Sequence, residues 1–142
     1  MANPFPHRIA VLWLSTLAVA IQAQAAQEPW TLVRSEPSAA YYLDMRNVHQ
    51  QGTYLVYRVL VDFNYGPRHD EAELYKSLQL IRYANCATRE QDTKSLLQYH
   101  APMGRGEPTW ILTFEDATLR MESVEPGSVS AQLLDIACSL KE

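Results

Sequence analysis

The sequence predicts an α+β domain: an antiparallel β-sheet of about five to six strands with a C-terminal helix packed on it. Apolar and polar residues alternate with a period of two over most of the chain after residue 29, which is typical of strands. The spacing becomes helical only after Pro126-Gly127. The chain of 142 residues has no internal repeat or long linker, so these elements belong to one domain.

The strands follow one another with turn residues between them. In chain order the predicted strands are Trp30–Arg34, Ala40–Asp44, Thr53–Phe63, Leu74–Tyr83, Lys94–His100 and Trp110–Phe114. The predicted breaks are Glu36-Pro37-Ser38, Gln51-Gly52, the polar loop Asn64–Glu73 and the Gly/Pro-rich loop Ala101–Pro108. Residues 87–93 fit either a turn or a continuation of a strand.

The clearest strand is Thr53–Phe63, where every second residue is apolar. Its apolar face consists of Leu55, Tyr57, Val59, Val61 and Phe63. Its mixed face consists of Tyr54, Val56, Arg58, Leu60 and Asp62. We expect the apolar face to pack inside the domain and the mixed face to carry the charges.

The predicted helix follows Pro126-Gly127, with Ser128 or Ser130 as its N-cap. One stripe at helical spacing is expected to lie on the sheet, and it comprises Val129, Leu133, Ile136, Ala137 and Leu140. Cys138 is one residue from this stripe, so a bond to Cys86 at the end of a strand would tie the helix to the sheet.

Residues 1–25 have the three parts of a secretory signal peptide, which leaves 26–142 as the predicted domain. His7 and Arg8 precede the uncharged run Ile9–Ile21, and Ala23-Gln24-Ala25 is a suitable cleavage site. A helix of this run rises roughly 20 Å, less than a ~30 Å hydrocarbon core, so a retained membrane anchor is the less favoured alternative. No cysteine lies near the cleavage site, which disfavours a lipid anchor.

Export also predicts a disulfide between the two cysteines, Cys86 and Cys138. The alternative is a pair of free buried thiols. No C-x-x-C motif is present, so the bond is expected to be structural rather than redox-active.

Charge and composition exclude several classes of protein. The formal net charge is −4 and the isoelectric point about 5.5, the wrong sign for binding nucleic acid or an anionic membrane surface. Hydrophobic residues make up 47% of the chain, too many for a disordered protein.

We predict no enzymatic activity, metal or cofactor, because no catalytic or ligand spacing is present. The nearest metal-like cluster is His69, Asp70, Glu71 and Glu73, which fits a solvated turn better. Gly104-Arg105-Gly106 lacks the spacing of a phosphate loop, and Gly127-Ser128 fits a helix cap better than a nucleophile. The carboxylates Glu107, Glu115 and Asp116 fit solvated turns. An enzyme with a site around His69, Asp70 and Glu73, or around His100, is the alternative.

The eight tyrosines point to recognition or to half-buried strands, since tyrosine suits both. Tyr54 shares the mixed face of its strand with Arg58 and Asp62, so this face is a candidate binding surface. Arg105 in the loop Ala101–Pro108 is the third candidate binding residue, because loops of this kind often carry function.

The order of several motifs resembles the surface-adhesin protein E family of Gram-negative bacteria. They are Trp30-Thr31-Leu32-Val33, Tyr41-Tyr42-Leu43-Asp44, Val59-Leu60-Val61-Asp62-Phe63, Lys76-Ser77, Cys86, Tyr99, Met103-Gly104-Arg105-Gly106, Pro126-Gly127-Ser128 and Cys138. The resemblance implies an antiparallel sheet with a C-terminal helix tied to it by one disulfide. It also implies adhesion to host matrix and serum proteins such as vitronectin and laminin, and an ability to dimerise.

Two features depart from the adhesin pattern. The lipid-attachment cysteine is absent. The centre of the chain is not rich in lysine: Arg68, Lys76 and Arg82 stand against Asp70, Glu71 and Glu73. Only the pair Cys86 and Cys138 is therefore carried over from the family.

We thus expect an exported, non-enzymatic binding module, located in the periplasm, at the cell surface or secreted, with a host matrix or serum protein or an envelope protein as partner. The alternative is a soluble periplasmic protein with a housekeeping or stress role and an unknown ligand. An exposed edge strand makes a homodimer an open alternative.

Overall fold

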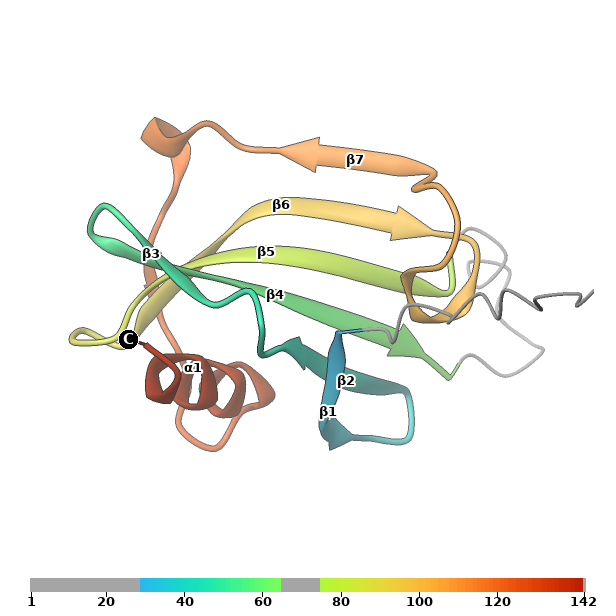
Figure 1. Ribbon diagram of the computed structural model, residues 1–142, viewed down its shortest axis with the longest axis horizontal. Coiled ribbons are helices and arrows are strands. Elements are labelled where there is room, and N and C mark those ends of the chain that lie inside the picture. The colour runs from blue at the N-terminus through green and yellow to red at the C-terminus, as the bar shows by residue number, and fades with distance from the viewer. Residues whose placement is uncertain (1–28, 65–74, 142) are drawn as a thin grey trace, which may run out of the picture.

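The computed structural model describes residues 29–64 and 75–141. These residues form an eight-stranded antiparallel sheet, two short 3₁₀ helices and one α-helix (Figure 1). The elements are β1 (Trp30–Ser35), β2 (Ala39–Asp44), β3 (His49–Gln51), β4 (Tyr54–Phe63), β5 (Ser77–Asn85), β6 (Glu90–Tyr99), η2 (Pro102–Gly104), β7 (Trp110–Thr113), η3 (Asp116–Thr118), β8 (Glu122–Ser123) and α1 (Val129–Ser139). The predicted signal peptide and nearly all of the predicted loop 64–73 lie outside these residues.

The sheet follows the chain order with two side branches. The main path is β1-β2-β4-β5-β6-β7, while β3 pairs with the start of β4 and β8 with the start of β6. All pairings are antiparallel, as expected for strands joined by short turns. The predicted class is therefore confirmed, but five to six strands is too low a count.

The strand count was underestimated because β3 and β8 have little sequence signal. Both are polar or charged and only three and two residues long, so neither has enough length to show alternation. They are strands because a longer neighbour offers them an unpaired edge.

Residues 87–93, for which the sequence allowed either a turn or a strand, contain both. A turn comes first, and β6 begins at Glu90.

The pairing register between β5 and β6 shifts by one residue at one point. Ile81 pairs with Ser95 and Arg82 with Thr93, so Lys94 is an additional residue on β6. Such a bulge redirects the side chain at the bulge and increases the local twist.

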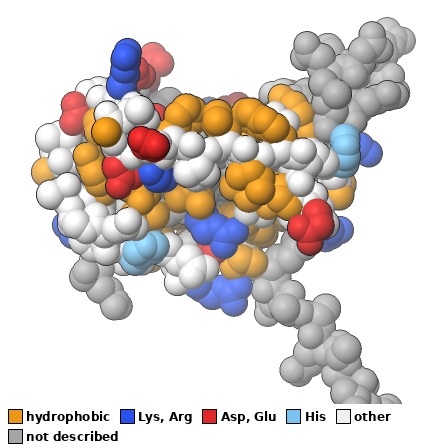
Figure 2. Space-filling view, turned by 90° about the horizontal axis from the view of Figure 1, so that it is seen from above, with side chains coloured by type: hydrophobic (Ala, Val, Ile, Leu, Met, Phe, Trp, Pro, Cys, Tyr) orange, Lys and Arg blue, Asp and Glu red, His pale blue; other side chains and the backbone are white. Residues whose placement is uncertain are grey.

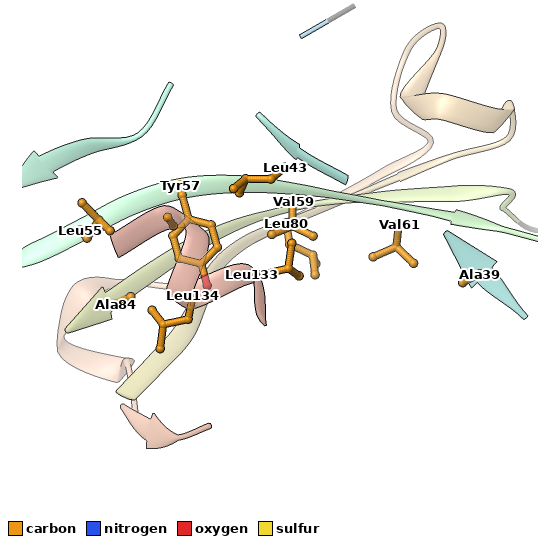
Figure 3. Packing of buried hydrophobic residues seen from close by; sticks show 11 residues of the cluster. Ala39, Leu43, Leu55, Tyr57, Val59, Val61, Leu80, Ala84, Leu133 and Leu134 are labelled. Atoms are coloured by element: carbon orange, nitrogen blue, oxygen red, sulfur yellow. The ribbon is translucent and has the colours of Figure 1, made fainter. Parts of the chain in front are cut away.

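The core lies between one face of the sheet and α1, on the lower side of the molecule in Figure 1. The predicted apolar face of β4 is confirmed, with Leu55, Tyr57 and Val59 at most 2% exposed. Figure 3 shows Tyr57 and Val59 close to Leu133 and Leu134 of the helix. An 11-residue helix is marginal in water on its own, so this packing is what holds it.

The buried stripe of α1 differs from the predicted one. Its buried residues are Ala131, Leu133, Leu134 and Ala137, whereas Leu140 is 36% exposed and caps the helix end. Leu134 is the largest change, since it is only 1% exposed and had no place in the predicted stripe. The helix contacts β4, β1 and β2, and this position turns Leu134 rather than Leu140 toward the sheet.

Both ends of the helix are fixed as the sequence suggested. Ser128 is the N-cap, accepting a hydrogen bond from the Ala131 amide at 3.1 Å, and Ser130 is not. The predicted disulfide is present between Cys86 and Cys138, whose Cα atoms are 5.8 Å apart. An ion pair between Arg89 and Asp135 joins the same β5–β6 turn to the helix.

Within the two described ranges, no helix has the length and apolar character of a membrane span.

Candidate binding face

The outer face is the sheet face opposite α1. Strand alternation places the even-numbered residues of β4 on it, and the pairings extend it to the neighbouring strands. Its members include Trp30, Leu32, Ala40, Tyr42, Asp44, Tyr54, Val56, Arg58, Leu60, Asp62, Ser77, Gln79, Ile81, Tyr83, Ser95, Leu97, Tyr99, Ile111 and Thr113. The mixed face that the sequence identified on β4 is thus the centre of a larger surface.

Arg58 is the central charge of the outer face. It donates to Gln79 Oε1 at 2.8 Å and to Asp44 Oδ2 at 3.4 Å, and its guanidinium lies 5.3 Å from the centre of the Trp30 ring. The Asp44 carboxylate is completely buried, and it also accepts from the amide of Arg46 and the side chain of Asn47. These partners fix Arg58 in one position, while about a third of its side chain stays exposed.

The loop Ala101–Pro108 is held against one end of this face by hydrogen bonds to buried or half-buried side chains. The Met103 amide donates to Asp62 Oδ1 at 2.7 Å, and the Gly104 amide donates to Ser77 Oγ at 2.9 Å. The Ser77 hydroxyl in turn donates to the Ala101 carbonyl at 2.7 Å. Met103 has a positive φ of 59°, which a non-glycine residue adopts only when its surroundings impose it. The loop is therefore a fixed part of the surface.

Gly104 is the position in this loop where an added side chain would have to displace a neighbour. Its φ is +64°, and a Cβ would lie 2.4 Å from Gln79 Nε2 and 3.3 Å from Leu60 Cδ1. We expect Gly104→Ala to lower the free energy of unfolding by about 2 kcal/mol, because it adds a clash to the backbone strain and moves Gln79 away from Arg58.

Gly106→Ala is the matched control for this substitution. Gly106 also has a positive φ, of 80°, but a Cβ there meets no atom within 4 Å. Gly106→Ala should therefore lower the free energy of unfolding by the backbone strain alone, about 1 kcal/mol. Urea unfolding monitored by tryptophan fluorescence measures both variants. Equal losses in the two variants would contradict the close packing of Gly104.

Apolar side chains are exposed around this fixed centre. On the outer face Leu32 of β1 is 54% exposed and Ile111 of β7 is 57% exposed. Figure 2, seen from above the view of Figure 1, shows hydrophobic side chains in adjacent groups with Lys or Arg side chains between them. Tyr54 contributes a further aromatic ring, 5.6 Å from that of Tyr83. Exposed apolar groups beside a fixed cation are typical of protein-binding surfaces.

Tyr99, at the end of the outer face near the loop, is buried. The side chain is 5% exposed, and burial raises the pKa of its hydroxyl, an effect that the nearby Arg58 charge opposes. The face is consequently closely packed around Tyr99.

The other end of the face contains a pocket of about 360 Å³, which we call the β3 pocket. Its lining residues are Asn47, His49, Gln51, Val56, Arg58, Ile81, Tyr83 and Lys94. Val56, Ile81 and Tyr83 provide an apolar floor from β4 and β5, and the β3 segment forms a polar wall. Arg58 connects this pocket, through Gln79, to the loop at the opposite end.

A second pocket, of about 340 Å³, lies on the helix side of the sheet. Arg82 lines it together with the carboxylates of Asp92, Glu122 and Glu125. Burial lowers the pKa of Arg82, and burial raises the pKa of its neighbour Tyr57 to about 12. Tyr57 donates its hydroxyl hydrogen to Gln91 and belongs to the core, so we assign this region a structural role.

The structure places the three predicted binding residues on the same side of the sheet. Tyr54 and Arg58 alternate onto the outer face of β4, and Arg105 follows Gly104, which contacts Gln79 on that face. Sequence reasoning missed Trp30 and Gln79 as partners of Arg58, and it missed Lys94 as a lining residue of the same pocket. Only strand pairing could have revealed them, because they come from three different strands.

The candidates for chemistry remain separate in the structure. No group of three or more metal-ligating side chains occurs within the described residues, and His69, Asp70, Glu71 and Glu73 lie outside them. His100 is exposed at the end of β6. Glu107, Glu115 and Asp116 are exposed, and Asp116 forms an ion pair with Lys94.

The chain matches the model of a known protein family. The model of the family described as surface-adhesin protein E matches residues 30–139, which include every described strand and the helix. No curated protein and no solved structure gives a significant match.

Proposed function

The chain belongs to the surface-adhesin protein E family, and we propose that it is an exported, non-enzymatic module that binds a protein partner through its outer face. The observation that carries this proposal is the fixed Arg58 with exposed apolar side chains around it. A preorganised surface loses little conformational freedom on binding, so more of its contact energy contributes to affinity. Following the family, the partner is a host matrix or serum protein or another envelope protein.

Export is supported by the family and by the disulfide, which forms in oxidising compartments. We propose that residues 1–25 are the signal peptide and 26–142 the mature domain. Both cysteines of the sequence are in the disulfide, so neither carries a lipid anchor. This favours, as the second candidate, a periplasmic protein of the same fold with an envelope ligand.

Binding to immobilised vitronectin and laminin tests the first candidate, with the purified, disulfide-bonded protein and a matched pair of variants. Leu32→Glu places a charge on the outer face, where Leu32 is 54% exposed. Leu140→Glu makes the same change at a leucine 36% exposed near the helix end. We expect saturable binding that Leu32→Glu weakens at least about tenfold and Leu140→Glu leaves unchanged.

Equal binding by both variants would place the contact away from the outer face. No saturable binding to either protein would remove the matrix-adhesin assignment.

Protease treatment of intact cells tests where the protein is located. Digestion before the outer membrane is opened would put the protein on the surface. Protection until it is opened supports the periplasmic candidate.

A further inference from the structure

Resting on the proposed function, we propose that the β3 pocket is the specificity site of the outer face and takes a carboxylate-bearing, otherwise apolar segment of the protein partner. The side chain that would receive the carboxylate is Lys94, and the segment's apolar groups would lie on Val56, Ile81 and Tyr83.

The charge of the lining favours an anion. Two of the lining residues, Arg58 and Lys94, are cationic, and none is a carboxylate. This is unusual in a chain with 16 acidic against 12 basic residues. By contrast, three carboxylates line the pocket on the helix side. A ligand with a carboxylate therefore meets only opposite or neutral groups in the β3 pocket.

The position of Lys94 results from the bulge in β6. Lys94 is the residue that the β5–β6 pairing skips, and its ammonium lies 5.9 Å from the centre of the Tyr83 ring, over the pocket floor. Its side chain is only 18% exposed. An ammonium held over an aromatic ring and largely out of water interacts more strongly with an incoming carboxylate than a free surface lysine does.

Asp116 occupies the position that the ligand carboxylate would take. Its carboxylate pairs with Lys94, yet its side chain is 66% exposed and comes from the short helix η3. Asp116 is the exposed partner of this ion pair, so water already competes for its carboxylate and a carboxylate from a partner can replace it on Lys94. The remaining cation, Arg58, already has the completely buried Asp44 as its counter-charge, which leaves Lys94 as the exchangeable one.

The apolar floor and the net charge select the kind of anion. A polyanion such as nucleic acid would be repelled by the excess of acidic residues and would not use the floor of Val56, Ile81 and Tyr83. A single carboxylate beside aliphatic side chains uses both features. An extended peptide segment with alternating acidic and aliphatic residues has this chemistry.

Two variants that break the same ion pair test the proposal. The probe is a blocked tripeptide with glutamate between two leucines, titrated into the purified, disulfide-bonded protein and followed by amide chemical shifts. We expect Lys94→Gln to weaken its binding at least about fivefold and Asp116→Asn to tighten it about twofold or more. Lys76→Gln removes the same charge from an exposed lysine outside the pocket, and it should change nothing.

The counterpart tripeptide with glutamine should bind at least about fivefold more weakly than the acidic one. Equal binding of both peptides would overturn the proposal. So would equal changes in the same direction for Lys94→Gln and Asp116→Asn, because these would reflect the lost ion pair alone.

The test separates this proposal from the proposed function. If the acidic tripeptide does not bind while Leu32→Glu still weakens binding to a matrix protein, the outer face is a binding surface and the β3 pocket is not its specificity site. If the tripeptide binds at Lys94 and no protein partner is found, the pocket is established and the adhesin role is lost.

Discussion

Replacing Cys86 and Cys138 by serine is expected to lower the free energy of unfolding by about 4 kcal/mol. The bond joins residues 52 apart in the sequence, and the entropy of closing a loop of that length in the unfolded chain gives this value. A domain has only about 5–15 kcal/mol in total, so the change removes a large part of its stability. The effect should be greatest on α1, because the bond and the Arg89–Asp135 pair both join it to the β5–β6 turn.

Urea unfolding of the oxidised protein, the reduced protein and the double serine variant measures this loss. The reduced protein and the variant should agree, since both lack the cross-link. Arg89→Gln is the matched control, because it breaks only an exposed ion pair at the same junction and should cost less than about 1 kcal/mol. A loss below about 1 kcal/mol on reduction would mean that helix packing alone holds the domain together.

Asp44→Ala is expected to cost about 3 kcal/mol, the largest effect of a single polar substitution on the outer face. The carboxylate is completely buried and accepts hydrogen bonds from the Arg46 amide, the Asn47 side chain and Arg58. Its removal leaves these donors unsatisfied and Arg58 without its counter-charge, and breaking a buried pair in this way costs about 3–5 kcal/mol. We expect a loss at the lower end of this range because Arg58 remains partly in contact with water.

Asp116→Asn is the control for this substitution, since it also removes a carboxylate from an ion pair but on an exposed side chain. It should change the free energy of unfolding by less than about 0.5 kcal/mol in the same urea experiment. If Asp44→Ala were equally mild, Arg58 would not depend on Asp44 for its position. The proposal of a preorganised outer face would then lose its basis.

Several parts of the fold could be predicted because they depend on local patterns. Every second residue of β4 is apolar along its ten residues, and Ser128 is followed by a helical stripe, so both elements were correctly identified. The pairing of Cys86 with Cys138 required only a count of two cysteines and an expected export signal. Strands β3 and β8 were missed because pairing with a longer neighbour, rather than their own residues, makes them strands.

The candidate site likewise has residues that the sequence could place and residues that it could not. Alternation on β4 was enough to place Tyr54 and Arg58 on one face, because the direction of a strand side chain depends only on its position in the strand. Lys94 could not be predicted as a neighbour of that face. Its position depends on a bulge in β6, which arises from the register between two strands.

The class of fold, the buried face of β4, the helix N-cap and the disulfide could be predicted from the residues alone, since each follows from residue spacing, local hydrogen bonding or cysteine number. Three other features are visible only in the folded chain: Leu134 faces the core, Asp44 is the counter-charge of Arg58, and a pocket without carboxylates lies beside β3. These features depend on contacts between residues distant in the chain. Such contacts are fixed by strand register and helix docking, which no local pattern records.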